Sequence, residues 1–305
     1  MVNNPFPWRN LLEGQVSRLC VHDLSSGETR VVYETTLGAA EAPNWTSDGN
    51  WLVFNLNGEL YRVQVAGGDT TKIKSGLELA NNDHLLDPDG FHVYTSQNDG
   101  HIYRVPLDGG EPTRVTSEDD GLVARYLHGV SPDGTFLAHV GGPELATLAP
   151  YNIYKLNLQT GETTQLTHTV KRHDGAEFSP DGQWIYFNSE RNSTIIGHCQ
   201  LFRMRTDGTS VEQLTFDERV NWFPHISPDE RHLAYLSFEP GTNGHPANVP
   251  AQIVITDDLL AAHPITRIDV FGGQGTINVP SWSPDSTQFA FADYPVLAAD
   301  KPPVL

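Results

Sequence analysis

The 305-residue sequence has little cysteine, no long apolar segment and few basic residues. Its two cysteines, Cys20 and Cys199, cannot build a disulfide framework and lack the spacing of metal-binding cysteine pairs. No apolar run approaches the roughly 18–20 residues that cross a membrane, and the first residues show no basic region followed by an apolar one. These absences predict a cytoplasmic protein without a membrane partner.

The charge balance excludes a second class of partners. Nineteen Lys and Arg residues stand against 38 Asp and Glu residues, which gives a formal net charge of −19. Such a chain is repelled by nucleic acid and by anionic membranes, so neither is expected as the main partner. A phosphate-binding loop, a dinucleotide fingerprint and a Gly-x-Ser-x-Gly motif are all missing from the sequence. Its function therefore has to be sought in how the chain is organised.

The sequence repeats one turn motif six times. Its clearest form is Ser179-Pro180-Asp181-Gly182, and the alternating apolar residues on both sides of it predict a β-hairpin. The aspartates of the six turns lie 41, 44, 48, 48 and 56 residues apart, at Asp48, Asp89, Asp133, Asp181, Asp229 and Asp285. A four-stranded propeller blade takes about 40–50 residues. The sequence therefore predicts an all-β, six-bladed propeller of four-stranded antiparallel blades.

The two ends of the chain complement each other. Two strand-like segments, at 19–22 and 29–33, precede the first hairpin, whereas the last repeat ends soon after its own hairpin at 279–292. We therefore expect the N-terminal strands to close the last blade, because closure removes the open edges that invite aggregation. The predicted division is an N-terminal arm at 1–15, one propeller domain at 16–294 and a C-terminal tail at 295–305.

Polar residues open the innermost strands of the predicted blades, next to the central channel. Long loops on the same face, at 141–151, 189–199 and 239–251, are where a rigid scaffold usually carries its function. The predicted substrate-binding residues are Asn82, His84, Arg125, Tyr126, Arg172, Asp174, Glu190, Asn221, Trp222 and Asn278. The plain alternative is that each histidine of this face is solvated, or satisfied inside the channel, and that Trp222 only fills the channel wall.

Basic residues also map to this face of a very acidic chain. They are Arg125, Lys171, Arg172, Arg191 and Arg219. Because the arginine fork suits carboxylates, their grouping predicts an acidic ligand. The alternative is that local acids such as Glu190 and Asp217 occupy them in ion pairs.

The repeats resemble the propeller of the TolB family. The resemblance rests on the segment from Pro280 to Asp285, on Asp-Gly-Gly turns such as 108–110, and on strands that end in Gln-Leu-Thr, as at 213–215. It covers about residues 16–294, nearly the whole chain. It implies a non-catalytic module that binds a protein or a peptide across the mouth of the channel.

The repeats also resemble oligogalacturonate lyases, which hold a divalent metal with several histidines and one glutamine over the channel. By position in the repeat, the implied metal ligands are His173, His225, His245 and Gln274. The implied metal is manganese, with nickel, iron or zinc as alternatives. The implied reaction is β-elimination from an acidic or oxidised oligosaccharide, a carbon–oxygen lyase activity, with His173 or His128 as the base and Arg191 or Arg172 as the substrate anchor.

Overall fold

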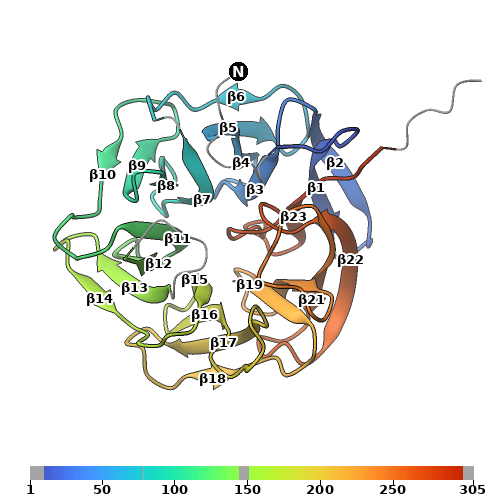
Figure 1. Cartoon of the computed structure of the whole chain (residues 1–305). Helices are drawn as coiled ribbons and strands as arrows, with labels where there is room; N and C mark the ends of the chain where they lie inside the picture. Colours follow the sequence, from blue (N-terminus) through green and yellow to red (C-terminus); the bar gives the residue numbers. More distant parts are fainter. Residues whose placement is uncertain (1–9, 78, 144–150, 298–305) are drawn as a thin grey trace, which may run out of the picture.

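The computed structural model describes residues 10–77, 79–143 and 151–297, which form a ring of six blades around a central axis (Figure 1). Blade 1 contains β3 (Ala40–Trp45), β4 (Trp51–Leu56), β5 (Glu59–Gln64) and β6 (Thr71–Lys72). Blade 2 contains β7 (Ala80–Leu86), β8 (His92–Gln97), β9 (Ile102–Pro106) and β10 (Thr113–Arg114). Blade 3 contains β11 (Ala124–Val130), β12 (Phe136–Gly142), β13 (Asn152–Asn157) and β14 (Thr163–Gln165).

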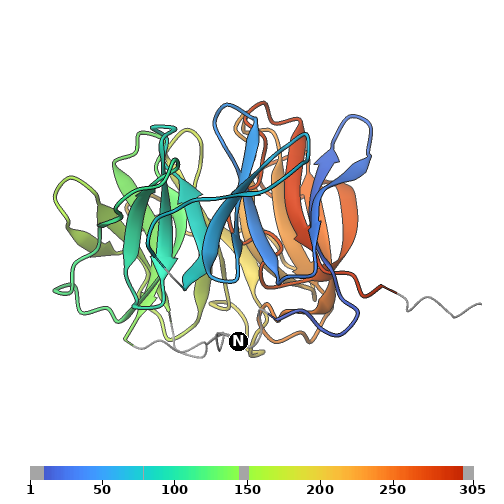
Figure 2. The ribbon, with the colours of Figure 1, turned by 90° about the horizontal axis from the view of Figure 1, so that it is seen from above.

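Blades 4 and 5 continue the ring, and every blade is antiparallel. Blade 4 contains β15 (His173–Phe178), β16 (Trp184–Ser189), β17 (Gln200–Arg205) and β18 (Glu212–Gln213). Blade 5 contains β19 (Val220–Ile226), β20 (Leu233–Phe238), β21 (Val249–Thr256) and β22 (Pro264–Gly272). In each of blades 1 to 5 the lowest-numbered strand lies innermost, and the edge-on view shows the strands running between the two faces of the ring (Figure 2). The described residues include no helix long and apolar enough to cross a membrane.

Blade 6 closes the ring with strands from both ends of the chain. β1 (Ser17–Asp23) pairs with β23 (Gln288–Asp293) on one side and with β2 (Thr29–Thr35) on the other. The predicted closure is confirmed. The innermost strand of this blade is shorter than predicted, because the chain around Trp282 makes only an isolated bridge to Phe289. Pro280 and Pro284 flank this bridge, and proline offers no N–H to a ladder. The predicted arm and tail lie partly outside the described residues.

The repeated turn has a local chemical cause. In blade 3 the Ser131 hydroxyl donates to Asp133 Oδ1 over 2.6 Å and accepts the Phe136 N–H over 2.8 Å. Asp133 Oδ1 also accepts the Thr135 N–H over 3.0 Å. The same three contacts recur in the turns headed by Thr46, Ser179, Ser227 and Ser283. The hydroxyl and the carboxylate thus bond the backbone groups that a hairpin end leaves unpaired.

Apolar packing lies mainly between neighbouring blades. One apolar cluster, for example, joins blades 3 and 4: it contains Ile153 of blade 3 and Met204 of blade 4, both fully buried, and the rings of Phe187 and Phe202 of blade 4, which stack at 5.6 Å between centroids. Because the spaces between neighbouring blades hold the large apolar side chains, the innermost strands can place polar groups along the axis.

Candidate functional site

The innermost strands carry irregularities where they approach the axis. The pairing register shifts within β3, β7, β11, β15 and β19 against the next strand of each blade. Three residues at these shifts have a positive φ: Ala42, Gly175 and Phe223. A bulge redirects the side chains beside it. At Phe223, whose φ is 53°, the conformation is strained for a bulky residue, and the side-chain oxygen of Asn188 holds it by accepting the Phe223 N–H over 3.0 Å.

A carboxylate between two histidines lies at the centre of the site. Asp174 Oδ1 is 2.6 Å from His128 Nε2, and Asp174 Oδ2 is 3.5 Å from His245 Nε2. The other ring nitrogen of His128 donates to the carbonyl oxygen of Asn278 over 3.3 Å. These contacts link the inner edges of blades 3, 4 and 6 and the loop after β20. We call His128, Asp174 and His245 the channel triad.

Charge outweighs burial in setting the protonation of His128 and Asp174. Burial lowers the pKa of His128, but the carboxylates of Asp174 and Asp83 outweigh it and raise that pKa to about 9. Burial raises the pKa of Asp174, yet the charge and hydrogen bond of His128 and the bond to His245 hold it well below its usual range. His128 and Asp174 are therefore an ion pair at neutral pH. A histidine that is already protonated cannot take up a proton, which departs from the predicted role of His128 as the base.

An aromatic wall borders the channel triad. The ring centroid of Trp222 is 4.2 Å from that of His245, and Phe223 lies 5.1 Å from His245 and 5.9 Å from His128. Trp222 is 2% exposed and Phe223 is fully buried. Sequence reasoning considered both Trp222 and Phe223 as aromatic residues that could stack on a sugar ring, but it gave no role to Asp83.

Several buried polar atoms around the axis have no hydrogen-bond partner among the described residues. Both side-chain amide atoms of Asn82, which is fully buried, are of this kind. So are Trp222 Nε1, His245 Nδ1 and Gln274 Oε1. Folded proteins leave few buried polar groups unsatisfied, because each costs about 1–3 kcal/mol. A group of them around one channel indicates a place that a ligand or ordered water completes.

The predicted metal ligands differ in what their atoms contact. Both ring nitrogens of His225 are engaged, Nδ1 with Glu177 and Nε2 with the Ile277 carbonyl, each over 2.5 Å. His173 Nε2 bonds the Thr169 hydroxyl over 2.9 Å, and burial and the charge of Arg191 lower its pKa to about 3. His245 contacts Asp174, and Gln274 keeps an unpaired oxygen.

The described residues contain one group of three His, Cys, Asp or Glu side chains whose possible metal-ligand atoms all lie within 4.8 Å of one another. This group is Asp87, Asp89 and His92. None of the predicted metal ligands belongs to that group. It lies at the turn of blade 2, on the opposite face from the long loops. Arg104 pairs with both of its carboxylates and offsets part of their charge.

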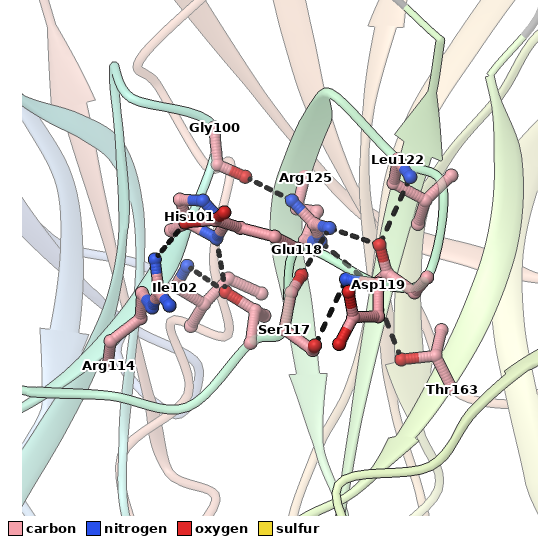
Figure 3. Close-up of polar contacts among 12 residues, drawn as sticks. Gly100, His101, Ile102, Arg114, Ser117, Glu118, Asp119, Leu122, Arg125 and Thr163 are labelled. Carbon is pink, nitrogen blue, oxygen red and sulfur yellow. Dashed lines mark hydrogen bonds and ion pairs between the residues drawn. The ribbon is translucent and has the colours of Figure 1, made fainter.

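Three of the predicted cations are engaged in ion pairs. Arg125 is 1% exposed and donates to the carbonyl oxygens of Gly100 and Ser117 over 2.9 and 2.8 Å, and it pairs with Asp120 (Figure 3). Arg172 pairs with Glu190 over 2.7 Å, and Arg219 with Glu239 over 2.8 Å. The cationic ligand site expected from the sequence is therefore not formed by these residues. The alternative, ion pairing with local acids, describes them.

The remaining predicted residues are mostly structural. His84 uses both ring nitrogens on backbone carbonyl oxygens, those of Asn82 over 2.9 Å and Val53 over 3.2 Å. The amide of Asn221 bonds Asp217 and Ser237 over 3.0 and 2.8 Å. Tyr126 packs edge-on against Tyr151 at 5.5 Å. Part of the predicted loop 141–151 falls outside the described residues.

Comparisons with known proteins identify the relatives of this architecture. The model of the TolB β-propeller domain family matches residues 128–250. A protein of Agrobacterium fabrum, the uncharacterised Atu1656, is 36% identical over 284 residues, which are 91% of this chain and 92% of that protein. A solved structure of a proposed TolB from Agrobacterium tumefaciens is 35% identical, with a TM-score of 0.84, and the match covers 93% of this chain and 99% of that one.

The similarity to a lyase is more distant. A structure of oligogalacturonate lyase in complex with manganese is 16% identical, with a TM-score of 0.56, covering 85% of this chain and 75% of that one. At this level the likeness extends to the fold alone. The prediction of a metal-dependent carbohydrate lyase is therefore wrong: the relatives that share about a third of the sequence over nearly its whole length are TolB-like propellers.

Proposed function

Because the chain belongs to the family of TolB-like β-propeller proteins, we propose that it is a non-catalytic binding module. Its ligand is a peptide or an exposed segment of a partner protein, which enters the mouth of the central channel. The channel triad and the aromatic wall of Trp222 and Phe223 form the floor and one side of this site.

The proposal rests on the buried polar atoms around the channel that have no hydrogen-bond partner among the described residues. Asn82 offers one donor pair and one acceptor, Trp222 Nε1 offers a donor, and Gln274 offers an acceptor. A peptide backbone presents the matching alternation of N–H and C=O groups. Together these features favour a peptide over a compact ion or a small anion.

The residues present do not fit the metal that the lyase resemblance implies. A metal ligand needs a free imidazole lone pair, and both ring nitrogens of His225 face acceptors that it already bonds. The binding proposal therefore contains no metal. Metal analysis of the purified protein tests this separately: stoichiometric manganese that is lost in His225→Ala would restore the metal prediction.

A peptide library displayed on phage and selected against the whole protein tests the binding proposal. We expect selected peptides to lose at least tenfold in affinity to Trp222→Ala and to Asn82→Ala, because both variants remove groups of the channel mouth. Trp51→Ala is the matched control, since Trp51 packs under Arg62 at the start of β4, in a blade strand that is not the innermost one. Thermal unfolding confirms that each variant is folded. Peptides that bind all three variants equally would place the binding site elsewhere.

A further inference from the structure

Exposed apolar side chains gather on the loops around blade 4, on the same face as the channel mouth. Val170, Ile195, Ile196 and Phe216 are exposed by 87, 61, 76 and 78%, and they lie in the segments that precede β15, join β16 to β17 and follow β18. An exposed cluster of large apolar residues on a chain of net charge −19 marks an interaction surface. We call these four residues the blade 4 rim.

The loop that carries two of the rim residues is held in place by hydrogen bonds. The Ser193 hydroxyl accepts the Ile195 N–H over 3.0 Å, and Lys171 Nζ donates to the Ser193 carbonyl oxygen over 2.9 Å. His198 Nε2 bonds the Asp217 carbonyl oxygen over 3.2 Å, which ties the loop to the segment of Phe216. A surface fixed in this way loses little conformational entropy when it is covered.

A cleft of about 280 Å³ opens beside the rim. Its lining is mostly polar, with Phe202 and Phe216 as its apolar part; the polar residues are Ser189, Asn192, Ser193, His198, Gln200, Gln213 and Asp217. The cleft thus offers hydrogen-bonding groups next to the exposed apolar side chains. That combination is typical of the core and edge of a protein interface.

Arg191 gives the surface its charge preference. Its guanidinium lies 5.8 Å from the ring of Phe202, which lines the cleft. Unlike Arg125, Arg172 and Arg219, it makes no ion pair with any described acidic residue, and one of its terminal nitrogens is buried without a hydrogen-bond partner there. Burial alone lowers its pKa, with no carboxylate to oppose the shift.

His173 stands next to Arg191. Its side chain is 2% exposed, and its Nδ1 has no hydrogen-bond partner among the described residues. A partly buried arginine without a counter-ion among the described residues, beside a histidine with an open ring nitrogen, is a place that a carboxylate completes. The two observations, an apolar rim and an unpaired cation, lie side by side on one blade.

We propose that the blade 4 rim is a second binding surface, distinct from the channel mouth, for a partner segment that carries apolar side chains beside one carboxylate. The carboxylate pairs with Arg191, and the apolar side chains cover Ile195, Ile196 and Phe216. A single acidic group is expected rather than an acidic run, because the strongly negative chain repels a highly charged partner.

Three labelled pentapeptides of leucine and phenylalanine, with aspartate, asparagine or lysine at the centre, test this proposal by fluorescence anisotropy on the full-length protein. We expect the aspartate peptide to bind about tenfold more tightly than the asparagine peptide. Arg191→Ala should remove that preference, and Ile196→Ser should weaken the binding of both the aspartate and the asparagine peptide. Arg205→Ala is the control: it removes an arginine of the same blade that stacks on Trp184 at the far end of β17.

The outcomes separate this proposal from the channel proposal. Trp222→Ala should leave the pentapeptides unaffected, and Arg191→Ala should leave the channel peptides unaffected. The proposal would be overturned if none of the three pentapeptides bound at about 1 mM, or if all three bound equally. It would also be overturned if the preference for the aspartate peptide survived in Arg191→Ala. A wild-type dimer in sedimentation that Ile196→Ser dissociates would overturn it too, since the rim would then be covered by a second copy of the chain.

Discussion

Two histidines of similar depth in this protein have opposite protonation behaviour. His128 and His139 are 3% and 0% exposed. Burial and the nearby Arg125 lower the pKa of His139 to about 4, whereas Asp174 and Asp83 overcome burial and raise the pKa of His128 to about 9. The sign of the neighbouring charge decides the outcome, because Coulomb interactions at contact distance in a poorly polarisable interior are of the same size as the desolvation penalty.

The raised pKa of His128 predicts a stability that depends on pH. A pKa that is higher in the folded chain than the ordinary value of 6.5 stabilises the fold fully below pH 6.5, and this contribution is lost as the pH rises through about 9. The free energy of unfolding, measured in urea, should fall by roughly 1–3 kcal/mol between pH 6.5 and 9. Asp174→Asn should abolish the fall, whereas Asp133→Asn, in an exposed turn, should keep it. A wild-type profile that is flat over this range would contradict the ion pair.

The ion pairs of the loop face could not be read from the sequence. Arg172 and Glu190 are 18 residues apart, and the partners His225 and Glu177 come from different blades. Which acid reaches which cation depends on loop paths and on bulges such as the one at Phe223, for which a repeat pattern carries no signal. The repeat pattern assigned these residues to one face of the ring, but it could not tell engaged groups from open ones.

The repeated hairpin turn is the element whose structure the sequence predicted best. Its bonds are local, from a hydroxyl and a carboxylate two residues apart to the backbone of the next strand. Local contacts need no knowledge of the rest of the fold, so each turn could be recognised by itself and the blades counted from their spacing. The exception, the reduced innermost strand of blade 6, follows from prolines that interrupt the pairing.

Removal of one turn carboxylate should therefore cost stability without changing binding. In Asp133→Ala, the Ser131 hydroxyl and the Thr135 N–H lose a shared acceptor. We expect a loss of about 1 kcal/mol in the free energy of unfolding, the size of a net hydrogen bond on the surface. Chemical denaturation measures it, and the affinity for channel peptides should be unchanged, because the turn lies on the opposite face. A loss of binding without a loss of stability would show that the two faces are not independent.

On the scale of the whole molecule, the ring depends on one junction. Blades 1 to 5 are continuous in sequence, whereas blade 6 consists of β1 and β2 from one end of the chain and β23 from the other. Leu19 and Val21 of β1 are almost fully buried against Ala290 and Ala292 of β23. An open ring would expose the edge of β23 and the flank of blade 1.

Deletion of residues 1–35 should therefore abolish cooperative unfolding of the entire propeller, not of blade 6 alone. The truncated chain keeps five complete blades, but it loses the strands that cover the edge of β23. Calorimetry should show no single sharp transition for this chain, and a deletion of residues 1–9, which leaves β1 and β2 intact, is the matched control.

Because the longer deletion can simply aggregate, a second experiment co-expresses residues 10–35 as a separate fragment. The fragment should pair with β23 and restore one cooperative transition. A truncated chain that melts as the whole protein does would mean that the other five blades hold the ring without the junction, and a co-expressed fragment that fails to associate would mean that the covalent link, rather than the pairing of β1 with β23, closes it.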